Sequence, residues 1–414
     1  MDRQPILLPY GDPAFVADPF PFYRQLREDG PVRRAAIAGG LDAWLVTRYE
    51  DGLAALSDPR LSSDVRDASD PRLMEQLPVT ERDSVLRNML RADPPDHTRL
   101  RRLVSKEFTA HRVAGLEPRV QEIADRLLDR IVPDGRADLV AAYALPLPVT
   151  VIGELLGVPE GDRHAFRRWT DDLMPRGAEP PDPARTDAAW RHMRGYLTGL
   201  IGEKRVRPED DLLSALVAAR DTEGSLDEDE LTAMALLLLV AGYITTVNLI
   251  GSGIAALLTH PGQMRRLRDD PALLPGAIEE FLRYDGPVDP GIARFAREDL
   301  TIAGVAVPRG ATVLVASVMA DRDPHRFPDP DRLDITRRDN AHLAFGHGIH
   351  YCLGAPLARL EGRVAIGTVL RRLPGLALAV EPGELRRRPG GLRGPEELPV
   401  TFAAGSAAGA RDQT

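Results

Sequence analysis

The residues best suited to chemistry are gathered in the ten-residue segment 345–354, which holds the chain's single cysteine, Cys352. We expect a helix to begin directly after Cys352, so that backbone N–H groups and the positive helix end lower the pKa of its thiol. Gly348 and Gly354 permit a tight loop and the close approach of a flat ligand. A lone cysteine at a helix start is usually structural. The whole arrangement, with His350 able to bind an anion, instead favours a metal ligand or a nucleophile.

This segment resembles the haem-ligand loop of the cytochrome P450 family, F-x-x-G-x-x-x-C-x-G, and it matches every fixed position. Those positions are Phe345, Gly348, Cys352 and Gly354, with Gly346 between the first two. The resemblance implies that Cys352 is the thiolate ligand of a haem b iron, which favours cleavage of the O–O bond. It also implies that Phe345 and its loop neighbours contact the haem, Phe345 shielding the sulfur from water. The implied fold is mainly α with a minor β component, and one long central helix passes over the haem.

Two haem propionates need cationic or hydrogen-bonding partners, and the resemblance supplies candidates from distant parts of the chain. His97 and Arg101 are i,i+4 on one expected helix and resemble the family's H-x-x-x-R motif. Together with Arg294 and His350, they are expected to bind the propionates. Each residue taken alone would be read as a solvated side chain, but four matching positions favour the binding role.

Glu280 and Arg283 resemble the family's E-x-x-R helix motif. At i,i+3 spacing the two side chains lie on one face of the helix. Such a pair is commonly an exposed ion pair that contributes little stability. Because this pair precedes a proline-rich connector and the cysteine loop, we expect it to form a core network that supports the haem loop.

The oxygen side of the haem is expected on the most apolar helix, in the segment Ala241-Gly242-Tyr243-Ile244-Thr245-Thr246. The segment resembles the family's A-G-x-[D/E]-T-T pattern, in which the helix loosens to form an oxygen pocket, and the resemblance makes its Ala, Gly and two Thr positions catalytic. Gly242 would let the backbone approach a ligand, and Thr245 would donate a hydrogen bond to dioxygen. The alternative for Thr245 is a bond back to the i−4 carbonyl. Ile244 holds the acid position and cannot carry protons, so water with Thr245, or polar groups of the substrate, must complete the relay.

Elements from most of the chain are needed to position these residues, and helical patterns dominate. The capping box Ser225-Leu-Asp-Glu228 is expected to begin the long apolar helix, which would end at Thr259 after about 52 Å at 1.5 Å per residue. Other helices are expected over residues 21–29, 49–57, 93–108, 115–132, 147–157, 160–175, 186–206, 210–222, 271–284 and 353–373. Strands are expected over residues 43–47, 300–307 and 312–316.

Composition bounds the class of protein. Of 414 residues, 43 % are hydrophobic and 28 % are charged, an ordinary globular mixture, and a net charge of −9 argues against a nucleic-acid binder. We find no signal peptide, and the longest apolar stretch, residues 233–242, is shorter than a membrane span needs. We therefore expect a soluble, cytoplasmic protein with no membrane partner. One domain is expected over residues 1–403, followed by a disordered tail over residues 404–414.

The resemblance implies a monooxygenase that inserts one oxygen atom of O2 into an organic substrate. Electrons would come from NAD(P)H through a ferredoxin reductase and a ferredoxin, because no flavin or iron–sulfur segment fits in the chain. An acidic ferredoxin is expected to dock on the cysteine side of the haem, against a basic patch formed by Arg99, Arg102, Lys106 and His111.

Substrate contacts are expected from five side chains and two longer segments. They are Tyr243, Ile244, Val288, Ile292 and Leu392, with residues 62–92 and 165–192. Because these contacts are mostly aliphatic or small and carry few charges, we expect a bulky, largely apolar substrate such as a secondary-metabolite scaffold.

Two other kinds of function remain open. Ile244 at the acid position favours an atypical oxidation, such as coupling or desaturation, or a haem protein that presents a substrate to a partner enzyme without turnover. A cysteine hydrolase built on Cys352 fits less well. His347 and His350 lie nearby in the sequence, but we find no Asn or Asp placed to orient them.

Overall fold

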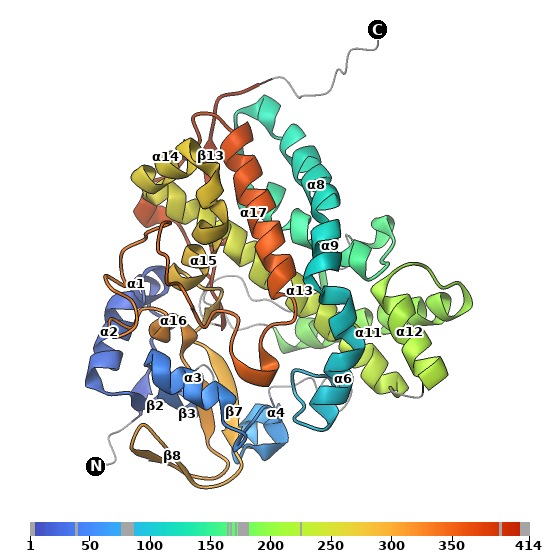
Figure 1. The fold of residues 1–414 in the computed structure, drawn as a ribbon, viewed down its shortest axis with the longest axis vertical. Coiled ribbons are helices and arrows are strands. Elements are labelled where there is room, and N and C mark those ends of the chain that lie inside the picture. The colour runs from blue at the N-terminus through green and yellow to red at the C-terminus, as the bar shows by residue number, and fades with distance from the viewer. Residues whose placement is uncertain are drawn as a thin grey trace.

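The computed structural model describes residues 5–37, 40–75, 87–163, 165, 168–169, 172, 182–223, 226–388 and 391–405. A small mixed sheet with its covering helices forms one side of the molecule, and a larger helical body forms the rest (Figure 1). The helices are α1 (Pro13–Ala17), α2 (Phe20–Asp29), α3 (Tyr49–Ser57), α4 (Arg72–Glu75), α6 (Asp96–Ser105), α7 (Ala110–Gly115), α8 (Glu117–Asp129), α9 (Pro146–Leu155), α11 (Pro183–Val206), α12 (Leu212–Glu223), α13 (Glu228–Thr259), α14 (Pro261–Asp269), α15 (Leu274–Tyr284), α16 (Ser317–Ala320) and α17 (Ala355–Arg372).

The strands are short and belong to one larger sheet and three small ones. The larger sheet has the order β1-β2-β3-β10-β7-β4, in which β10 runs parallel to β3 and antiparallel to β7. The strands are β1 (Ile6–Leu7), β2 (Val32–Ile37), β3 (Leu41–Val46), β4 (Leu61–Ser62), β5 (Arg136–Asp138), β6 (Val288–Asp289), β7 (Ile292–Ala296), β8 (Leu300–Ile302), β9 (Val305–Val307), β10 (Thr312–Val315), β11 (Ala377–Leu378), β12 (Gly391–Leu392) and β13 (Pro399–Thr401).

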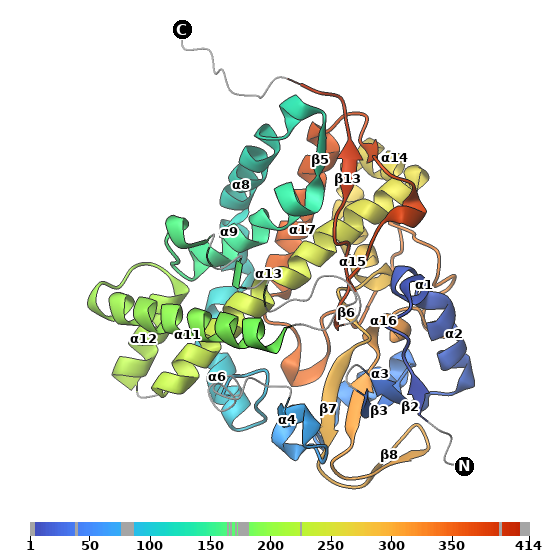
Figure 2. The same ribbon diagram turned by 180° about the vertical axis from the view of Figure 1, so that it is seen from behind.

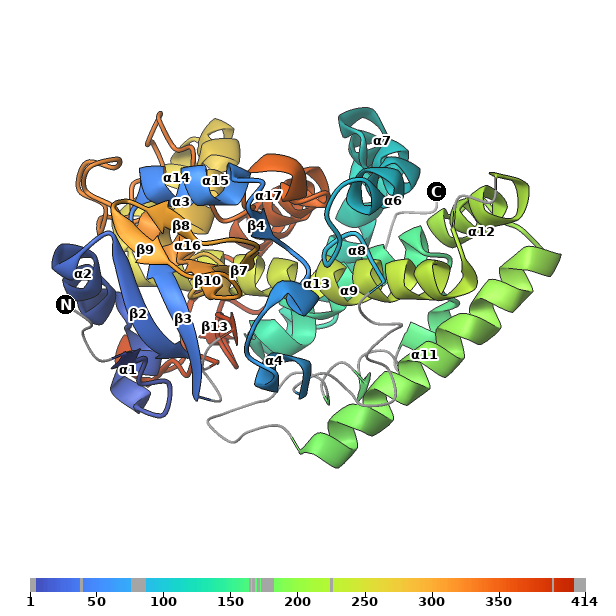
Figure 3. The same cartoon turned by 90° about the horizontal axis from the view of Figure 1, so that it is seen from below.

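The long helix α13 is the axis of the helical body. It packs against α9, α11, α15 and α17, so most of its side chains are buried. Figure 2 shows it running obliquely from α11 and α12 toward α14, and Figure 3 shows it spanning from the α12 side to the side that carries the sheet. A helix that is apolar around most of its circumference is stable only when other elements cover it in this way.

Most of the expected elements are present, with shifted ends. The 49–57 helix is confirmed as α3, and the helix expected over 93–108 begins only at Asp96, after two prolines, and ends in a 3-10 turn. The segment 300–307 is a hairpin, because Ala303 and Gly304 at its centre have positive φ angles. Much of the segment 160–175, with Ser225 and residues 406–414, lies outside the described residues.

The capping box at the start of α13 differs from the expected pair Ser225 and Glu228. Asp227 is the N-cap: its side chain accepts the backbone N–H of Glu230, and the Glu230 carboxylate accepts the N–H of Asp227. A capping box pairs the N-cap with the residue three positions later, so Asp227 and Glu230 form the box rather than Ser225 and Glu228.

In the part of the chain that the structure describes, one helix is long and apolar enough to cross a membrane by length and composition. That helix is α13, and 72 % of its most apolar 18-residue window is buried inside the protein. The expectation that the apolar stretch is too short therefore does not hold for the whole helix. Its burial is that of a core helix, which passes the same test.

Candidate functional site

The cysteine loop joins the sheet side of the molecule to α17. The Cys352 N–H donates to the Phe345 carbonyl (2.9 Å), which closes the loop on itself. Gly346 and Gly348 have φ angles of 70° and 72°, a region that favours glycine, and a Cβ on Gly348 would lie 2.8 Å from the Leu56 carbonyl oxygen. Both glycines are therefore required by the shape of the loop, and Gly348 also by its packing against α3.

Gly354 differs from the other glycines of the loop. Its φ angle of −79° is ordinary, and a Cβ added there would meet nothing within 4 Å. The expectation that it permits the tight turn is therefore wrong, although the open space at Gly354 fits the close approach of a ligand. Phe345 is half-buried and packs under the Arg359 guanidinium, which lies 4.6 Å from the ring centroid.

The electrostatics of the sulfur depart from the sequence-based expectation. Burial raises the pKa of the Cys352 thiol, while the N–H groups of Gly354 and Ala355 and the charge of Arg101 lower it without offsetting the burial. The expected lowering of the thiol pKa is thus wrong for the protein alone, because desolvation of a thiolate outweighs the donors at the helix start.

Four donors expected to bind carboxylates converge beside this loop. The rings of His97 and His350 lie 4.3 Å apart, and the Nε2 atom of His97 is buried without a hydrogen-bond partner. Burial lowers the pKa of His97 to about 4, helped by the charges of His350, Arg101 and Arg294. Burial likewise lowers the pKa of Arg294 to about 10. The structure therefore holds positive groups close together, an arrangement that an anion would stabilise.

A hydrogen bond from Arg101 joins this cluster to the cysteine loop. One guanidinium nitrogen of Arg101 donates to the carbonyl of Tyr351 (2.7 Å), the residue directly before Cys352. Asp93 is a carboxylate whose charge reaches both His97 and Arg294, but it is already engaged by Ser62 Oγ (2.5 Å) and by Arg297 (2.7 Å).

The motifs assigned three further residues of this cluster no role of their own, although Ser63 and Arg91 lie in the segment 62–92 that was expected to contact substrate. Ser63 Oγ lies 2.9 Å from His350 Nε2, Asp93 Oδ1 lies 3.9 Å from the same nitrogen, and Arg91 is close enough to Arg294 for its charge to lower the pKa of that guanidinium. Asp93 was visible in the sequence as the start of Asp-Pro-Pro-Asp. Nothing in the spacing marked Ser63 or Arg91, since the fold brings them in from separate loops.

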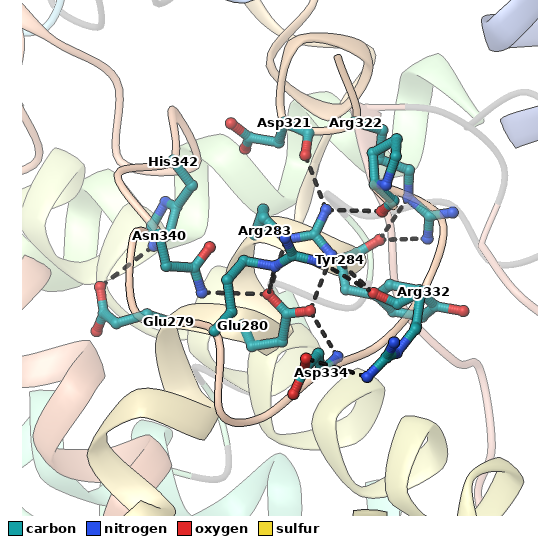
Figure 4. A network of polar contacts seen from close by, with 12 residues as sticks. Glu279, Glu280, Arg283, Tyr284, Asp321, Arg322, Arg332, Asp334, Asn340 and His342 are labelled. Atoms are coloured by element: carbon teal, nitrogen blue, oxygen red, sulfur yellow. Dashed lines mark hydrogen bonds and ion pairs between the residues drawn. The ribbon is translucent and has the colours of Figure 1, made fainter. Parts of the chain in front are cut away.

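Glu280 and Arg283 form a fully buried ion pair on α15, with both Nε and one terminal nitrogen bonded to the carboxylate at 2.7 and 2.9 Å. The same carboxylate accepts the backbone N–H of Asp334 (2.8 Å) and the side chain of Asn340 (3.2 Å). Arg283 donates in addition to three carbonyls, including that of Asp321 (3.0 Å), and Figure 4 shows how these bonds gather the segment around the pair. The pair thus fixes the connector that leads into the cysteine loop.

A second network, which the sequence did not reveal, lies next to this pair. Both Glu279 oxygens accept from Arg359 (2.8 Å each), and His342 Nε2 lies 3.2 Å from the same carboxylate. Burial would raise the pKa of Glu279, but the bonds from His342 and Arg359 outweigh it and lower the pKa to about 2. Glu279 therefore fastens α15 to α17 and to the start of the cysteine loop. Its position next to Glu280 was the only sequence signal.

Helix α13 presents one accessible turn in an otherwise buried stretch. Ala241 is exposed and Thr245 is half-buried, one turn apart on the same face. The Thr245 hydroxyl donates to the Ala241 carbonyl (3.2 Å), which is the alternative left open by the sequence. The helix is α-helical without interruption from Glu228 to Thr259, so the expected loosening is not observed.

Gly242 has a different role from the one expected. A Cβ on Gly242 would lie 2.9 Å from the Cδ1 atom of Ile152 on α9. The missing side chain therefore lets α9 approach α13 closely, and it is Ala241 that faces the accessible space. The structure thus explains Gly242 by helix packing, and its contact with a ligand stays a prediction.

Tyr243, Ile244 and Thr246 are buried in the packing around α13. Tyr243 lines a small internal cavity shared with Ile152 and Gly153 of α9, on the face away from Ala241. The structure therefore gives Tyr243 a place in the core, and its contact with substrate stays a prediction. Ile244 carries its aliphatic side chain into the core, where it can bind no proton.

The remaining predicted substrate contacts lie on short strands. Val288 of β6 lies directly opposite Leu392 of β12, and both side chains are half-buried. Ile292 begins β7 close to the cysteine loop, because its Cδ1 atom is 3.2 Å from the position of a Cβ on Gly346. Of the two longer segments expected to contact substrate, parts lie outside the described residues.

The predicted basic patch is smaller than expected. Arg99 is paired with Glu230 of α13 (2.5 Å) and with Asp96, so its charge is already compensated. Arg102, Lys106 and His111 are exposed at the end of α6 and in the turn and helix that follow. The patch is therefore these three residues, without Arg99.

Comparisons with known proteins agree along nearly the whole chain. The family match is "Cytochrome P450", over residues 181–377. The cytochrome P450 monooxygenase PikC of Streptomyces venezuelae is 52 % identical over 402 residues, covering 96 % of this chain and 94 % of the relative. The 6-deoxyerythronolide B hydroxylase of Saccharopolyspora erythraea is 45 % identical, covering 94 % of this chain and 96 % of the relative.

A solved structure gives the same result in three dimensions. The crystal structure of a myxobacterial cytochrome P450, CYP267B1, in complex with myristic acid has a TM-score of 0.90 and 42 % identity, covering 94 % of this chain and 98 % of that chain. The mainly helical fold with small sheets, the single cysteine in its loop and this similarity lead to one conclusion. The chain belongs to the cytochrome P450 family and is a haem-thiolate monooxygenase.

Proposed function

We propose that this enzyme inserts one oxygen atom of O2 into a bulky, largely apolar small molecule of secondary metabolism. The observation that carries the proposal is the position of Ala241 and Thr245, an accessible turn on the otherwise buried α13, together with aliphatic contacts from β6, β7 and β12. Relatives support the substrate class: one is named a 6-deoxyerythronolide B hydroxylase, and another was solved with myristic acid. We further propose that residues 1–403 act as one domain in the cytoplasm.

The residues around the cysteine loop fit a haem. Haem carries two carboxylates on one edge, and His97 Nε2 is a buried donor without a partner beside Arg101, Arg294 and His350. These four residues would hold the propionates, and Cys352 would bind the iron through its sulfur. A thiol that coordinates a metal ion is deprotonated outright, which overcomes the effect of burial on Cys352. When bound, the haem supplies the activation of O2 and the transfer of an oxygen atom.

Thr245 is the residue on the accessible turn of α13 whose hydroxyl could hold a proton for the reaction. Its hydroxyl donates to the Ala241 carbonyl at 3.2 Å, which leaves its oxygen free to accept a hydrogen bond from water. Ile244 supplies no acid, so we propose that water held by Thr245 delivers the protons. Ala241, being small, leaves the substrate room beside this hydroxyl.

We propose that electrons reach the cysteine side of the molecule from NAD(P)H through a ferredoxin reductase and a ferredoxin. Arg102, Lys106 and His111 are exposed there and can meet an acidic surface. Arg101 lies on the same helix as Arg102, and its bond to the Tyr351 carbonyl joins that helix to the cysteine loop. A ferredoxin docked on this patch would therefore lie near the cysteine ligand.

The direct test is turnover under ¹⁸O2. The purified holoenzyme, a ferredoxin, a ferredoxin reductase and NADPH are incubated with 6-deoxyerythronolide B or with myristic acid as probes, and products are analysed by mass spectrometry. We expect a product that carries one ¹⁸O atom. Absence of a labelled product from every apolar probe in a wider panel would contradict the proposal.

Ile244 favours a second candidate, an oxidation that removes hydrogen or couples two atoms without inserting oxygen. Such a reaction, or a role in presenting substrate without turnover, needs less proton delivery. Ile244 has no acid group to deliver protons. The same experiment separates the candidates. Desaturation or coupling gives an oxidised product without ¹⁸O, and a presenting role gives a bound but unchanged probe.

A further inference from the structure

The cluster beside the cysteine loop holds one more arginine than the haem requires. Two propionates bring two negative charges, and Arg101 and Arg294 bring two positive charges, with His97 and His350 as further donors. Arg91 adds a third guanidinium, and its charge reaches Arg294. The two propionates of a bound haem would compensate Arg101 and Arg294, so they would leave the charge of Arg91 without a counterion.

The protein itself offers little to compensate Arg91. The structure gives its guanidinium no hydrogen bond or ion pair within the described residues. Among the described carboxylates, Asp64 is the one whose charge favours the protonated form of Arg91. Asp64 already accepts a hydrogen bond from Arg66 (Nε–Oδ1 2.9 Å). Asp93, the carboxylate that reaches Arg294, is taken by Ser62 and Arg297. Burial lowers the pKa of Arg91, as expected for a cation held away from water.

The backbone places Arg91 on the α13 side of the site. The Met89 N–H lies 3.4 Å from the Met234 sulfur on α13, and the Asn88 side chain and carbonyl accept the N–H groups of Leu90 and Arg91. Met234 is seven residues before Ala241, which is about two helical turns. Arg101, in contrast, is tied to the cysteine loop. The segment that carries Arg91 therefore lies against α13 on the face that holds Ala241 about two turns later.

We propose that Arg91 binds a carboxylate of the substrate, so that this enzyme selects an apolar molecule that ends in one negatively charged acid group. This rests on the proposed function and narrows its substrate class. A guanidinium and a carboxylate form two parallel charge-assisted hydrogen bonds, and partial burial strengthens them by excluding water. The acid would anchor one end of the substrate while its apolar body packs against Val288, Ile292 and Leu392.

The test compares two probes that differ only in charge. Myristic acid and methyl myristate are titrated into the holoenzyme, and binding is followed by calorimetry and by the haem absorption shift. We expect the wild-type protein to bind the acid at least about tenfold more tightly than the ester. Arg91→Gln should lose about tenfold in affinity for the acid and keep its affinity for the ester, and Arg91→Lys should recover part of the loss.

Matched controls make the result specific. Arg265→Gln removes an exposed arginine on α14, far along the sequence from the site, and should change neither affinity. Arg91→Glu should reverse the preference and favour tetradecylamine over the acid. Retention of haem by each variant is checked by its absorption spectrum before titration.

Three results would overturn the inference. The first is a wild-type protein that does not prefer the acid, either because it binds the ester as tightly or because it binds neither probe. The second is an Arg91→Gln variant with an unchanged ratio of acid to ester affinity. The third is loss of haem from Arg91→Gln and Arg91→Lys, which would assign Arg91 to the propionates. Failure of the wild-type protein to bind haem would instead contradict the proposed function.

Discussion

At the scale of single residues, the site depends on side chains whose surroundings set their chemistry. Cys352 is held by a loop whose turns need Gly346 and Gly348, and desolvation raises the pKa of its thiol. The donors at the helix start do not offset this burial, so we propose that coordination to a haem iron would stabilise the thiolate. Thr245 already donates its proton within α13, so the role that we propose for its hydroxyl is to hold water.

Thr245→Ala should uncouple the enzyme, because it removes the hydroxyl that we assign to proton delivery. Product formed per NADPH oxidised should fall at least about threefold, with a matching rise in hydrogen peroxide, while substrate binding is unchanged. Thr245→Ser, which keeps the hydroxyl, should retain most of the coupling. Coupling is measured as the ratio of product to NADPH consumed, and an unchanged ratio in Thr245→Ala would remove Thr245 from the relay. Ile244→Glu tests whether the missing acid limits this enzyme.

The motifs predicted which residue types gather at the site better than they predicted the direction in which each side chain points. The sequence placed His97, Arg101, Arg294 and His350 together, and the fold brings these distant residues into one cluster. It did not give the packing of Gly242 and Tyr243, because a motif does not say which face of a buried helix meets its neighbour. It named Arg91 only within the segment 62–92, because only the tertiary structure brings Arg91 to Arg294.

At the scale of elements, two ion-pair networks on α15 hold the cysteine loop in place. Glu280 with Arg283 fixes the connector, and Glu279 joins α15 to Arg359 of α17. Breaking a buried pair by removing one partner strands the other charge and typically costs about 3–5 kcal/mol.

Periodicity and caps predicted where these helices run. The ends shifted where prolines, capping pairs and hairpin turns decide the boundary.

The connector contains a carboxyl group that should make stability depend on pH. Asp321 is buried, accepts the N–H of Leu343 (2.6 Å), and burial raises its pKa to about 7, opposed by His342, that N–H and Arg283. A raised acid pKa means that the folded state holds the proton. The stabilisation is complete below the unfolded pKa of 3.8 and is lost as the pH rises toward 7.

Asp321→Asn should remove this dependence, because the amide oxygen still accepts the Leu343 N–H and does not ionise. Between pH 4 and 7 the wild-type unfolding free energy should lose a contribution on the order of 2–4 kcal/mol that the variant keeps. Urea unfolding at several pH values, on both proteins, measures the two slopes. Equal slopes would show that Asp321 does not titrate differently in the folded and unfolded states.

At the scale of the whole molecule, the cluster of donors lies between a sheet and a helical body that meet at the cysteine loop. The residues that we assign to the site come from β7, α6, α13 and the loop before α17. The fold class followed from the helical patterns and the resemblance, since long apolar helices with few strands leave few alternatives. Which loops meet could not follow from sequence, because those contacts are non-local.

The exposed patch at the end of α6 should govern electron delivery. The double change Arg102→Glu with Lys106→Glu reverses two exposed charges, one on α6 and one in the turn that follows it. We expect reduction by an acidic ferredoxin to slow by about tenfold or more at low salt. The absorption spectrum of the haem should not change. The effect should shrink as salt screens the charges. Arg265→Glu on α14 serves as the matched control, and an unchanged reduction rate in the double variant would place the docking surface elsewhere.

The central claim is that Cys352 is the ligand of the haem iron. The most direct measurement is the absorption spectrum of the dithionite-reduced protein with carbon monoxide, recorded for the wild type and for Cys352→Ser. We predict a Soret band at the long wavelength typical of thiolate-ligated haem in the wild type, and its loss in the variant. A wild-type protein without haem, or a variant with the same long-wavelength band, would contradict the account.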